Sequence, residues 1–267
     1  MTHADLETRI TGATAYEEFL VPALFAGWAE RVAAAAKIDP GTRVLDVACG
    51  TGVLARAVAA HAGASGSVTG VDLDPGMVAV ARRLAPTLAW KEGSAESLPF
   101  PNASFDVVVS QFALMFFTDK RQALREMLRV LVPGGRLCVA VWAALEDTPP
   151  YATEVALLER YVSKAAADAL RLPFALGNRA DVTALFASAG VESVAIATLA
   201  DQGRFPSIRA MLEADIQGWL PLVGIVLTHE QHEQLIAAAE RELAGYLTAE
   251  GECVFEMPGH VVTGRKA

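Results

Sequence analysis

The sequence predicts an α/β domain in which helices cover a parallel sheet, and two observations lead to this prediction. Short apolar runs recur through the first two-thirds of the 267 residues, and helix-like stretches separate them. Such an alternation is typical of a parallel sheet that is buried on both faces. Hydrophobic residues make up 53% of the chain and charged residues 20%, so the chain resembles an ordinary globular protein with a large core.

Five strands and three helices are predicted in the first part of the chain. One helix is rich in alanine, the next begins with a proline that its first turn tolerates, and the third places apolar side chains along one face. A Pro133-Gly134-Gly135 segment predicts a turn just before the fifth strand. The predicted strands are residues 43–48, 68–72, 88–92, 105–110 and 136–142, and the predicted helices are residues 53–62, 75–84 and 120–130.

The rest of the chain is predicted to complete the same single domain, residues 1–267. Helices are expected at 151–170 and 181–189, and strands at 193–199 and 253–263, where Pro258 and Gly259 favour a sheet edge or a bulge. Two helix-rich blocks, 15–37 and 209–247, are interpreted as covers over one end of the sheet, although they could instead only pack the core or form a homodimer interface. The predicted parts are an N-terminal helical cover at 15–37, a core at 42–199, a helical insertion or lid at 200–250 and a last strand at 252–264.

Charge and cysteine content narrow the classes of partner and compartment. The net charge is −9 and the basic residues are scattered, which argues against a nucleic-acid surface. The first residues lack a signal-peptide pattern, and no apolar run reaches the roughly 18 residues that a membrane span needs, so a cytoplasmic location without a membrane span is expected. Cys49, Cys138 and Cys253 are far apart, so neither a disulfide framework nor a metal site is expected.

A glycine turn follows the first predicted strand, in the stretch "VLDVACGTGVLARAV" at residues 44–58. Gly50 and Gly52 fall at the carboxyl end of that strand, where open α/β sheets bind ligands. Glycine lets the backbone approach a ligand closely, and the amides at a helix start donate to negative groups. Because Gly50, Gly52 and Ala55 also satisfy the dinucleotide pattern G-x-G-x-x-A, the turn alone leaves two kinds of nucleoside ligand open.

Two aspartates bear on this choice. Asp72 ends the second strand about 20 residues beyond the turn, the position from which an acid accepts hydrogen bonds from ribose hydroxyls, although it could instead cap the helix that follows, a role that Asp74 could also fill. Asp46 lies inside the first strand and needs a cationic or hydrogen-bond-donating partner. An amino-acid ammonium would suit Asp46 and a pyrophosphate would be repelled by it. The alternative is that Asp46 only binds loop amides and fixes the turn.

Four ordered segments resemble a known family. They are "VLDVACGTG", "VDLDPGM", "EGSAESLPFPNASFDVVVSQFALMF" and "LREMLRVLVPGGRLCVAVW", all within residues 42–142. Together they resemble class I S-adenosylmethionine-dependent methyltransferases, in the branch related to ubiquinone/menaquinone biosynthesis methyltransferases. The resemblance implies a Rossmann-like, seven-stranded, mostly parallel sheet with an antiparallel last strand and helices on both faces, and S-adenosyl-L-methionine as the cofactor.

The resemblance also implies roles for residues at matched positions. The turn would pass the methionine part of the cofactor with Asp46 near its ammonium, Asp72 would hold the ribose, and Leu73 and Met77 would pack against adenine. Ser94 stands where an acid commonly precedes the alanine of the adenine-edge loop, and its hydroxyl accepts less strongly than a carboxylate. The implied cofactor-binding residues are Asp46, Ala48, Cys49, Gly50, Gly52, Asp72, Leu73, Met77, Ser94, Ala95, Glu96, Gln111 and Phe112.

The implied reaction is an in-line displacement at the sulfonium methyl by an O, N, S or C nucleophile. Good positioning of the two reactants can supply roughly 7–11 kcal/mol, so a general base is optional. No histidine falls in a matched segment, so no catalytic residue is assigned, and only His229 and His232 in the second cover deserve a test. A small, largely apolar acceptor is expected in a pocket of aromatic residues, which could equally belong to the core. These residues are Tyr16, Phe19, Trp28, Phe116 and Trp219.

Two other functions remain open from the residues. An NAD(P)-dependent Rossmann oxidoreductase shares the spacing of the glycines and Asp72. A common catalytic pair of reductases is Tyr-x-x-x-Lys, whereas this chain offers Tyr161 and Lys164, three apart. The other alternative is a non-catalytic protein that binds the cofactor for assembly or regulation, since a fold does not determine a function.

Overall fold

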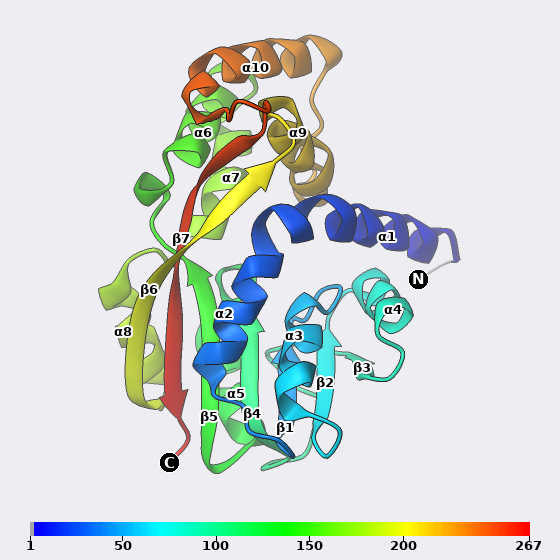
Figure 1. Ribbon diagram of the computed structural model, residues 1–267, viewed down its shortest axis with the longest axis vertical. Helices are drawn as coiled ribbons and strands as arrows, with labels where there is room; N and C mark the ends of the chain where they lie inside the picture. The colour runs from blue at the N-terminus through cyan, green and yellow to red at the C-terminus, as the bar shows by residue number, and fades with distance from the viewer. Residues whose placement is uncertain (1–2) are drawn as a thin grey trace.

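The computed structural model describes residues 3–267 and contains one seven-stranded sheet with the order β3-β2-β1-β4-β5-β7-β6 (Figure 1). The first five strands pair in parallel, and β7 runs antiparallel to both β5 and β6. The predicted fold class is therefore confirmed. The strands are β1 Arg43–Val47, β2 Ser67–Asp72, β3 Ala89–Glu92, β4 Phe105–Gln111, β5 Leu131–Trp142, β6 Glu192–Phe205 and β7 Cys253–Arg265.

Helices lie on both faces of this sheet. α2 and α3 pack together on one face, and α5 and α8 pack together on the other (Figure 1). Two further segments, at Tyr16–Phe25 and Ala214–Trp219, are π-helical. The α-helices are α1 His3–Ala15, α2 Ala26–Ala36, α3 Val53–Ala62, α4 Pro75–Leu84, α5 Lys120–Val130, α6 Pro149–Tyr161, α7 Lys164–Arg171, α8 Arg179–Ala189, α9 Ile208–Glu213 and α10 His229–Glu242.

Two predicted boundaries in the second half of the sheet and its helices are wrong. The Pro-Gly-Gly segment lies within β5 as an irregularity rather than before the strand, because Gly134 donates its amide to the carbonyl of Lys266 and regular pairing with β4 resumes at Arg136. The helix predicted at 151–170 is two helices, α6 and α7. A break occurs there because Ser163 caps α7 by accepting from the amide of Ala166 at 3.1 Å.

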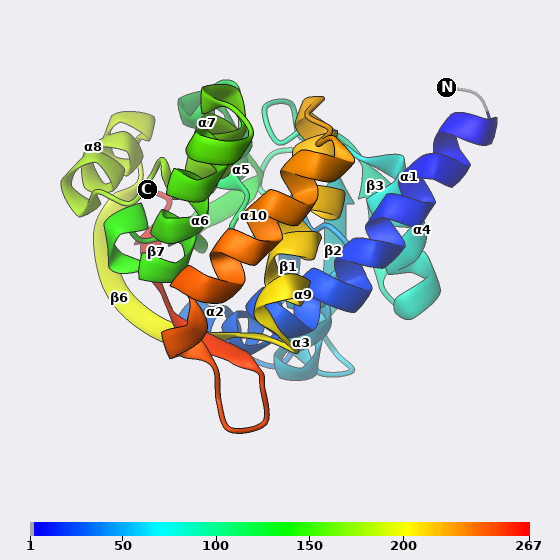
Figure 2. The ribbon, with the colours of Figure 1, turned by 90° about the horizontal axis from the view of Figure 1, so that it is seen from above.

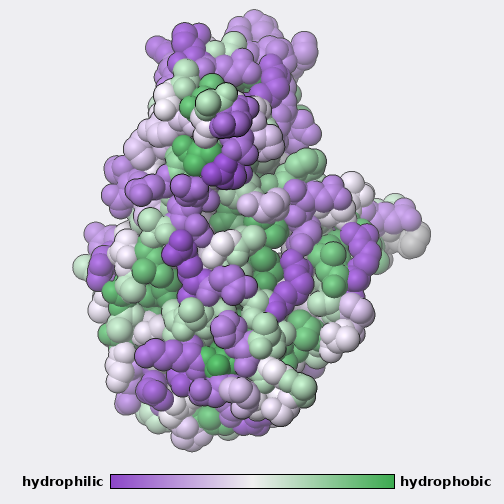
Figure 3. Space-filling view, in the orientation of Figure 1, coloured by the Kyte–Doolittle hydropathy of each residue, from purple (hydrophilic) through white to green (hydrophobic). Residues whose placement is uncertain are grey.

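The last two strands extend beyond the predicted limits and carry a second lobe. β6 continues to Phe205, so residues 200–205 of the predicted insertion are strand. Beyond the core sheet, α6 packs on α7 and α10, and α9 packs on α10. We call this group the lid lobe: α6, α7, residues 208–246, and the ends of β6 and β7 beside them. It lies at one end of the sheet (Figures 1 and 2), and its outer surface is mostly polar (Figure 3).

The N-terminal cover is longer than predicted. Residues 4–36 form one continuous helix whose mean hydropathy, 1.3 in its most apolar window, would allow a membrane span by length and composition, contrary to the sequence expectation. In the structure 44% of that window is buried, α1 packs on α4 and α2 packs on α3. Glu17 in the middle of this helix forms an ion pair with Arg56 of α3 at 2.7 Å. The helix is thus fastened along the core.

Candidate functional site

The glycine turn after β1 has a tight backbone conformation and is hydrogen-bonded to the end of β2. Ala48, Gly50 and Gly52 all have positive φ, at 55°, 53° and 88°. The amide of Cys49 donates to the carbonyl of Val71 at 3.0 Å, which ties the turn to the end of β2. Parallel pairing of β1 with β2 brings the carboxyl ends of the two strands together, so the turn and Asp72 meet at one edge of the sheet.

Asp72 binds the turn directly. One carboxylate oxygen accepts from the amide of Gly50 at 2.8 Å, and the other accepts from the amide of Asp74 at 2.8 Å. Asp74 in turn accepts from the amide of Gly76 at 2.7 Å and caps α4. The helix cap is therefore Asp74, and Asp72 faces the turn. Burial raises the pKa of Asp72, and the bonds from Asp74 and Gly50 oppose that rise.

Asp46 lies beneath the turn with an incomplete set of partners. Its side chain is 1% exposed, and it accepts a backbone hydrogen bond from Ala55. Within residues 3–267 its second oxygen, Oδ2, has no hydrogen-bond partner. Burial, with the charge of Asp72, raises the pKa of Asp46 well above its ordinary value. An amide in the first turn of α3 thus satisfies only part of this carboxyl group.

Tyr16 of the first π-helix lies against the turn. A Cβ built on Gly50 would lie 3.8 Å from Cε1 of the Tyr16 ring. The neighbouring Glu17 accepts from the hydroxyl of Thr51 and pairs with Arg56, so two contacts fasten this segment to the turn and α3. Burial and the charges of Asp72, Glu17 and Asp46 raise the pKa of the Tyr16 hydroxyl, which therefore stays protonated.

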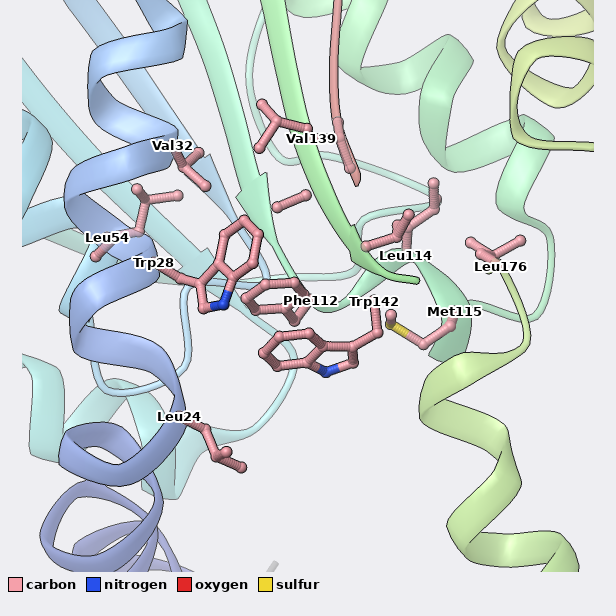
Figure 4. Packing of buried hydrophobic residues seen from close by; sticks show 14 of the residues in the cluster. Leu24, Trp28, Val32, Leu54, Phe112, Leu114, Met115, Val139, Trp142 and Leu176 are labelled. Atoms are coloured by element: carbon pink, nitrogen blue, oxygen red, sulfur yellow. The ribbon is translucent and has the colours of Figure 1, made fainter. Parts of the chain in front are cut away.

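Trp28 and Phe112, predicted as pocket and cofactor residues, lie in the hydrophobic core (Figure 4). Phe112 stacks on Trp142 with ring centroids 3.5 Å apart, and Trp28 meets Phe112 edge-on at 5.2 Å. Trp28 is 1% exposed and Phe112 is 6% exposed. Phe25 continues the cluster toward the turn, because its ring lies 5.4 Å from that of Tyr16. These aromatic rings form the wall behind the turn.

Among the residues predicted beside adenine, one side chain is exposed and two accept backbone hydrogen bonds. Leu73 is 74% exposed beside Asp72, which leaves an apolar surface open at that position. Ser94 accepts from the amide of Glu96 at 3.2 Å. The Glu96 carboxylate accepts from the amides of Thr118 and Asp119, so it fastens the start of α5. The predicted roles of Leu73, Ser94 and Glu96 in binding the cofactor stay predictions.

The remaining predicted cofactor residues surround the same edge of the sheet. Gln111 donates to the carbonyl of Phe25 at 3.1 Å, while its own side-chain oxygen is buried and has no partner in the described chain. Ala95 is partly buried against the hydrophobic core. Met77 lies in the first turn of α4, with its side chain half-buried. Gln111 therefore offers a hydrogen-bond acceptor beside the aromatic wall.

The other predicted pocket residues lie at the boundary with the lid lobe. Phe116, 41% exposed, packs on Trp219 with ring centroids 5.1 Å apart. Trp219 donates its indole hydrogen to the carbonyl of Ala169 at 3.0 Å. These contacts join the loop after β4 to the lid lobe. Phe19 is 63% exposed on the first π-helix and its role in a pocket stays a prediction.

Trp90 of β3 shapes the turn, and sequence reasoning missed it. A Cβ on Gly52 would lie 2.3 Å from Cη2 of Trp90, and one on Gly70 would lie 2.4 Å from Cζ3. The indole hydrogen of Trp90 is donated to the carbonyl of Ala85 at 2.9 Å, which holds the ring in place. Gly70 inside β2 was the available signal, since a glycine inside a strand often marks a close approach.

The two candidate histidine bases and the reductase-like tyrosine–lysine pair make other contacts than those of the glycine turn. His229 is exposed, and His232 of α10 lies 3.0 Å from Glu213. Tyr161 ends α6, whereas Lys164 begins α7 and pairs with Asp168. A tyrosine and a lysine on separate helices do not form one catalytic helix face.

Comparison with known proteins fits this arrangement. Residues 45–139 match the methyltransferase domain family. This core is similar to the domains of that family. Ubiquinone/menaquinone biosynthesis C-methyltransferase UbiE of Ectopseudomonas mendocina (strain ymp) is 45% identical to the chain over 108 residues, which are 38% of this chain and 42% of that protein. The chain thus matches less than half the length of this curated methyltransferase.

Solved methyltransferase-like structures share the fold over more of the chain. The YcgJ protein of Bacillus subtilis has a TM-score of 0.58 and 23% identity, covering 89% of this chain and 97% of that one. Phosphoethanolamine N-methyltransferase 2 of Haemonchus contortus, in complex with S-adenosyl-L-methionine, has a TM-score of 0.62 and 17% identity, covering 96% of this chain and 57% of that one. At these identities the likeness shows the fold alone. The family match of residues 45–139 and the relative that is 45% identical confirm the predicted family resemblance.

Proposed function

We propose that the protein transfers a methyl group from S-adenosyl-L-methionine to a small, largely apolar acceptor. The methyltransferase match of residues 45–139 supports this, and the observation that carries it is Asp46. A buried carboxylate oxygen without a donor requires a partner, and the ammonium of the methionine moiety would supply both charge and hydrogen bonds. A dinucleotide pyrophosphate at the same turn would add repulsion.

The residues around the turn fit the rest of this cofactor. The carboxylate of Asp72 accepts the amides of Gly50 and Asp74 and retains acceptor capacity, which the ribose hydroxyls would use. The exposed Leu73 side chain would pack against adenine. When bound, the cofactor supplies an electrophilic methyl group on a sulfonium. The protein's part is to hold that group and the acceptor in line.

Cys49 lies in the turn, where a thiolate would compete for the methyl group. Burial raises the pKa of this thiol well above its ordinary value, and the charges of Asp46 and Asp72 raise it further. Cys49 therefore stays a neutral thiol at physiological pH and is a poor nucleophile. Its burial beside these two carboxylates therefore disfavours methylation of Cys49 itself.

Acceptor chemistry depends on positioning rather than on an assigned base. The unpartnered oxygen of Gln111 and the buried hydroxyl of Ser110, also without a partner in the described residues, lie at the end of β4. Both can orient an acceptor or the methionine moiety through hydrogen bonds. The cytoplasmic location, the homodimer and the exclusion of nucleic acid stay predictions.

Isotope transfer tests this function. The purified protein is incubated with S-adenosyl-L-methionine labelled in its methyl group and a metabolite extract of the host, and products are identified by mass spectrometry. We expect label in a small molecule, with at least tenfold slower transfer by a folded Asp72→Ala variant at limiting cofactor. Cofactor binding without label in any metabolite would indicate the non-catalytic alternative instead.

A further inference from the structure

The lid lobe contains a second pair of buried acids, outside the glycine turn. Glu154 of α6 is 0% exposed, and Asp215 of the second π-helix is 6% exposed. Both oxygens of Glu154 and the Oδ2 oxygen of Asp215 are buried without a hydrogen-bond partner in the described chain. Unpartnered buried carboxylate oxygens are rare in folded proteins and call for a partner. A single proton shared between the two acids could form a hydrogen bond to only some of these three oxygens.

Among the described residues, no positively charged group acts on Glu154 or Asp215. Within the described residues, the carboxylate of Asp215 is the one charged group that acts on Glu154. Burial raises the pKa of Asp215 to about 7 and that of Glu154 well above its ordinary value. A cation entering from outside would stabilise the ionised forms of both acids. The site is therefore suited to a positively charged ligand.

The surroundings favour an organic cation over a metal ion. No group of three His, Cys, Asp or Glu side chains that could hold a metal occurs among residues 3–267. Tyr151, one helical turn before Glu154, lies 5.5 Å from the ring of Phe174 and 5.9 Å from that of Phe255. Aromatic rings beside carboxylates attract an ammonium group through their π faces and accept its apolar substituents.

The π-helix that carries Asp215 also contacts the first π-helix, which lies against the glycine turn. A Cβ on Gly218 would lie 3.9 Å from Cδ1 of Leu20, on the π-helix that presents Tyr16 to the turn. The same segment ends at Trp219, which packs on Phe116 after β4. π-helical turns occur frequently at functional sites. The acid pair is thereby joined, through one short segment, to both the cofactor side and the acceptor side of the core.

We propose that Glu154 and Asp215 bind an amino group of the methyl acceptor, as its ammonium ion, inside the lid lobe. This inference rests on the proposed methyl transfer and narrows the acceptor to an apolar molecule that carries an amine. The ammonium donates its hydrogens to the unpartnered carboxylate oxygens, and the aromatic side chains hold the adjoining hydrocarbon. The acids anchor the acceptor while the core presents the methyl group.

The test compares a cationic probe with its neutral counterpart. Calorimetry measures the binding of 2-phenylethylammonium and of 2-phenylethanol to the full chain saturated with S-adenosylhomocysteine. We expect the ammonium ion to bind at least tenfold more tightly than the alcohol. Glu154→Gln and Asp215→Asn should each remove this preference, whereas Glu159→Gln should keep it, because Glu159 lies on the exposed side of α6 and pairs with Arg171.

Thermal unfolding of the unliganded variants gives a second measurement. Acids kept for a ligand do not stabilise the empty protein, so Glu154→Gln should unfold at the same or a higher temperature. A clear fall in that temperature, no binding of the ammonium probe, or equal binding of the two probes would overturn the inference. Failure of S-adenosylhomocysteine to bind the wild-type chain would instead refute the proposed methyl transfer.

Discussion

The glycine turn and the lid lobe both bury a carboxylate that lacks a full set of partners, but they do so in different settings. Asp46 accepts the amide of Ala55 at the start of α3 and lies in a segment that matches the methyltransferase family. Glu154 has no hydrogen-bond partner for either oxygen among residues 3–267 and lies beyond residue 139, where that match ends. We therefore expect the shared core to specify the cofactor and the individual lid lobe to specify the acceptor.

The largest expected effect distinguishes the two glycines of the turn. Gly52→Ala should destabilise the fold by about 2–5 kcal/mol, because the new Cβ meets Trp90 and the residue has a left-handed φ. Gly50→Ala should cost only about 1–2 kcal/mol, since its Cβ makes an ordinary contact with Tyr16. Urea unfolding of both variants measures the difference. Equal losses would show that Trp90 does not constrain the turn.

The next effect concerns how stability depends on pH in the lid lobe. The pKa of Asp215 is raised to about 7 in the folded state, so the folded state binds a proton that the unfolded state has already lost. The free energy of unfolding should therefore fall as pH rises from about 4 to about 7, by up to about 1.4 kcal/mol per pH unit.

Asp215→Asn removes this titration and is the matched comparison. Urea unfolding at several pH values should give the wild type a steeper loss of stability across that window than the variant. Because acids outside this pair titrate equally in both chains, the difference between the two curves isolates Asp215 together with its effect on Glu154. Parallel curves would show that Asp215 ionises normally and that its burial imposes no electrostatic penalty.

The smallest effect concerns the N-terminal helix over the turn. Glu17→Gln removes the ion pair with Arg56 and weakens the bond from Thr51, which should cost about 1 kcal/mol. Amide hydrogen exchange in residues 16–25 should accelerate as this segment opens more often. Glu18→Gln, at the exposed neighbouring position, should leave exchange unchanged. Identical exchange in both variants would contradict a fastening role for Glu17.

The sequence predicted the fold best where a local residue pattern reflects a requirement of the backbone. The helix-covered parallel sheet follows from the alternation of apolar runs and helices, and the turn follows from glycines at the end of β1. The assignment of the helix cap to Asp74 required the structure, because Asp72 and Asp74 are both compatible with a cap by sequence. Motif spacing fixed the position of Asp72 without fixing its contacts.

The acid pair of the lid lobe was beyond prediction for a physical reason. The acids come from α6 and from a π-helix about 60 residues later, and no pattern along the chain signals their approach. The aromatic residues were equally ambiguous, since Trp28 and Phe112 lie in the core while Phe116 and Trp219 lie at the lobe boundary. Sequence identifies an aromatic side chain, but tertiary packing decides what it faces.

Cofactor choice tests the account most directly. Calorimetric titration of the purified chain with S-adenosyl-L-methionine and, separately, with NADH should show saturable binding of the first alone. Asp72→Ala, with an unchanged circular dichroism spectrum, should bind S-adenosyl-L-methionine about 10–100-fold more weakly, because hydrogen bonds to a charged group contribute about 1.5–3 kcal/mol. Saturable NADH binding without S-adenosyl-L-methionine binding, or unchanged affinity in the folded variant, would contradict it.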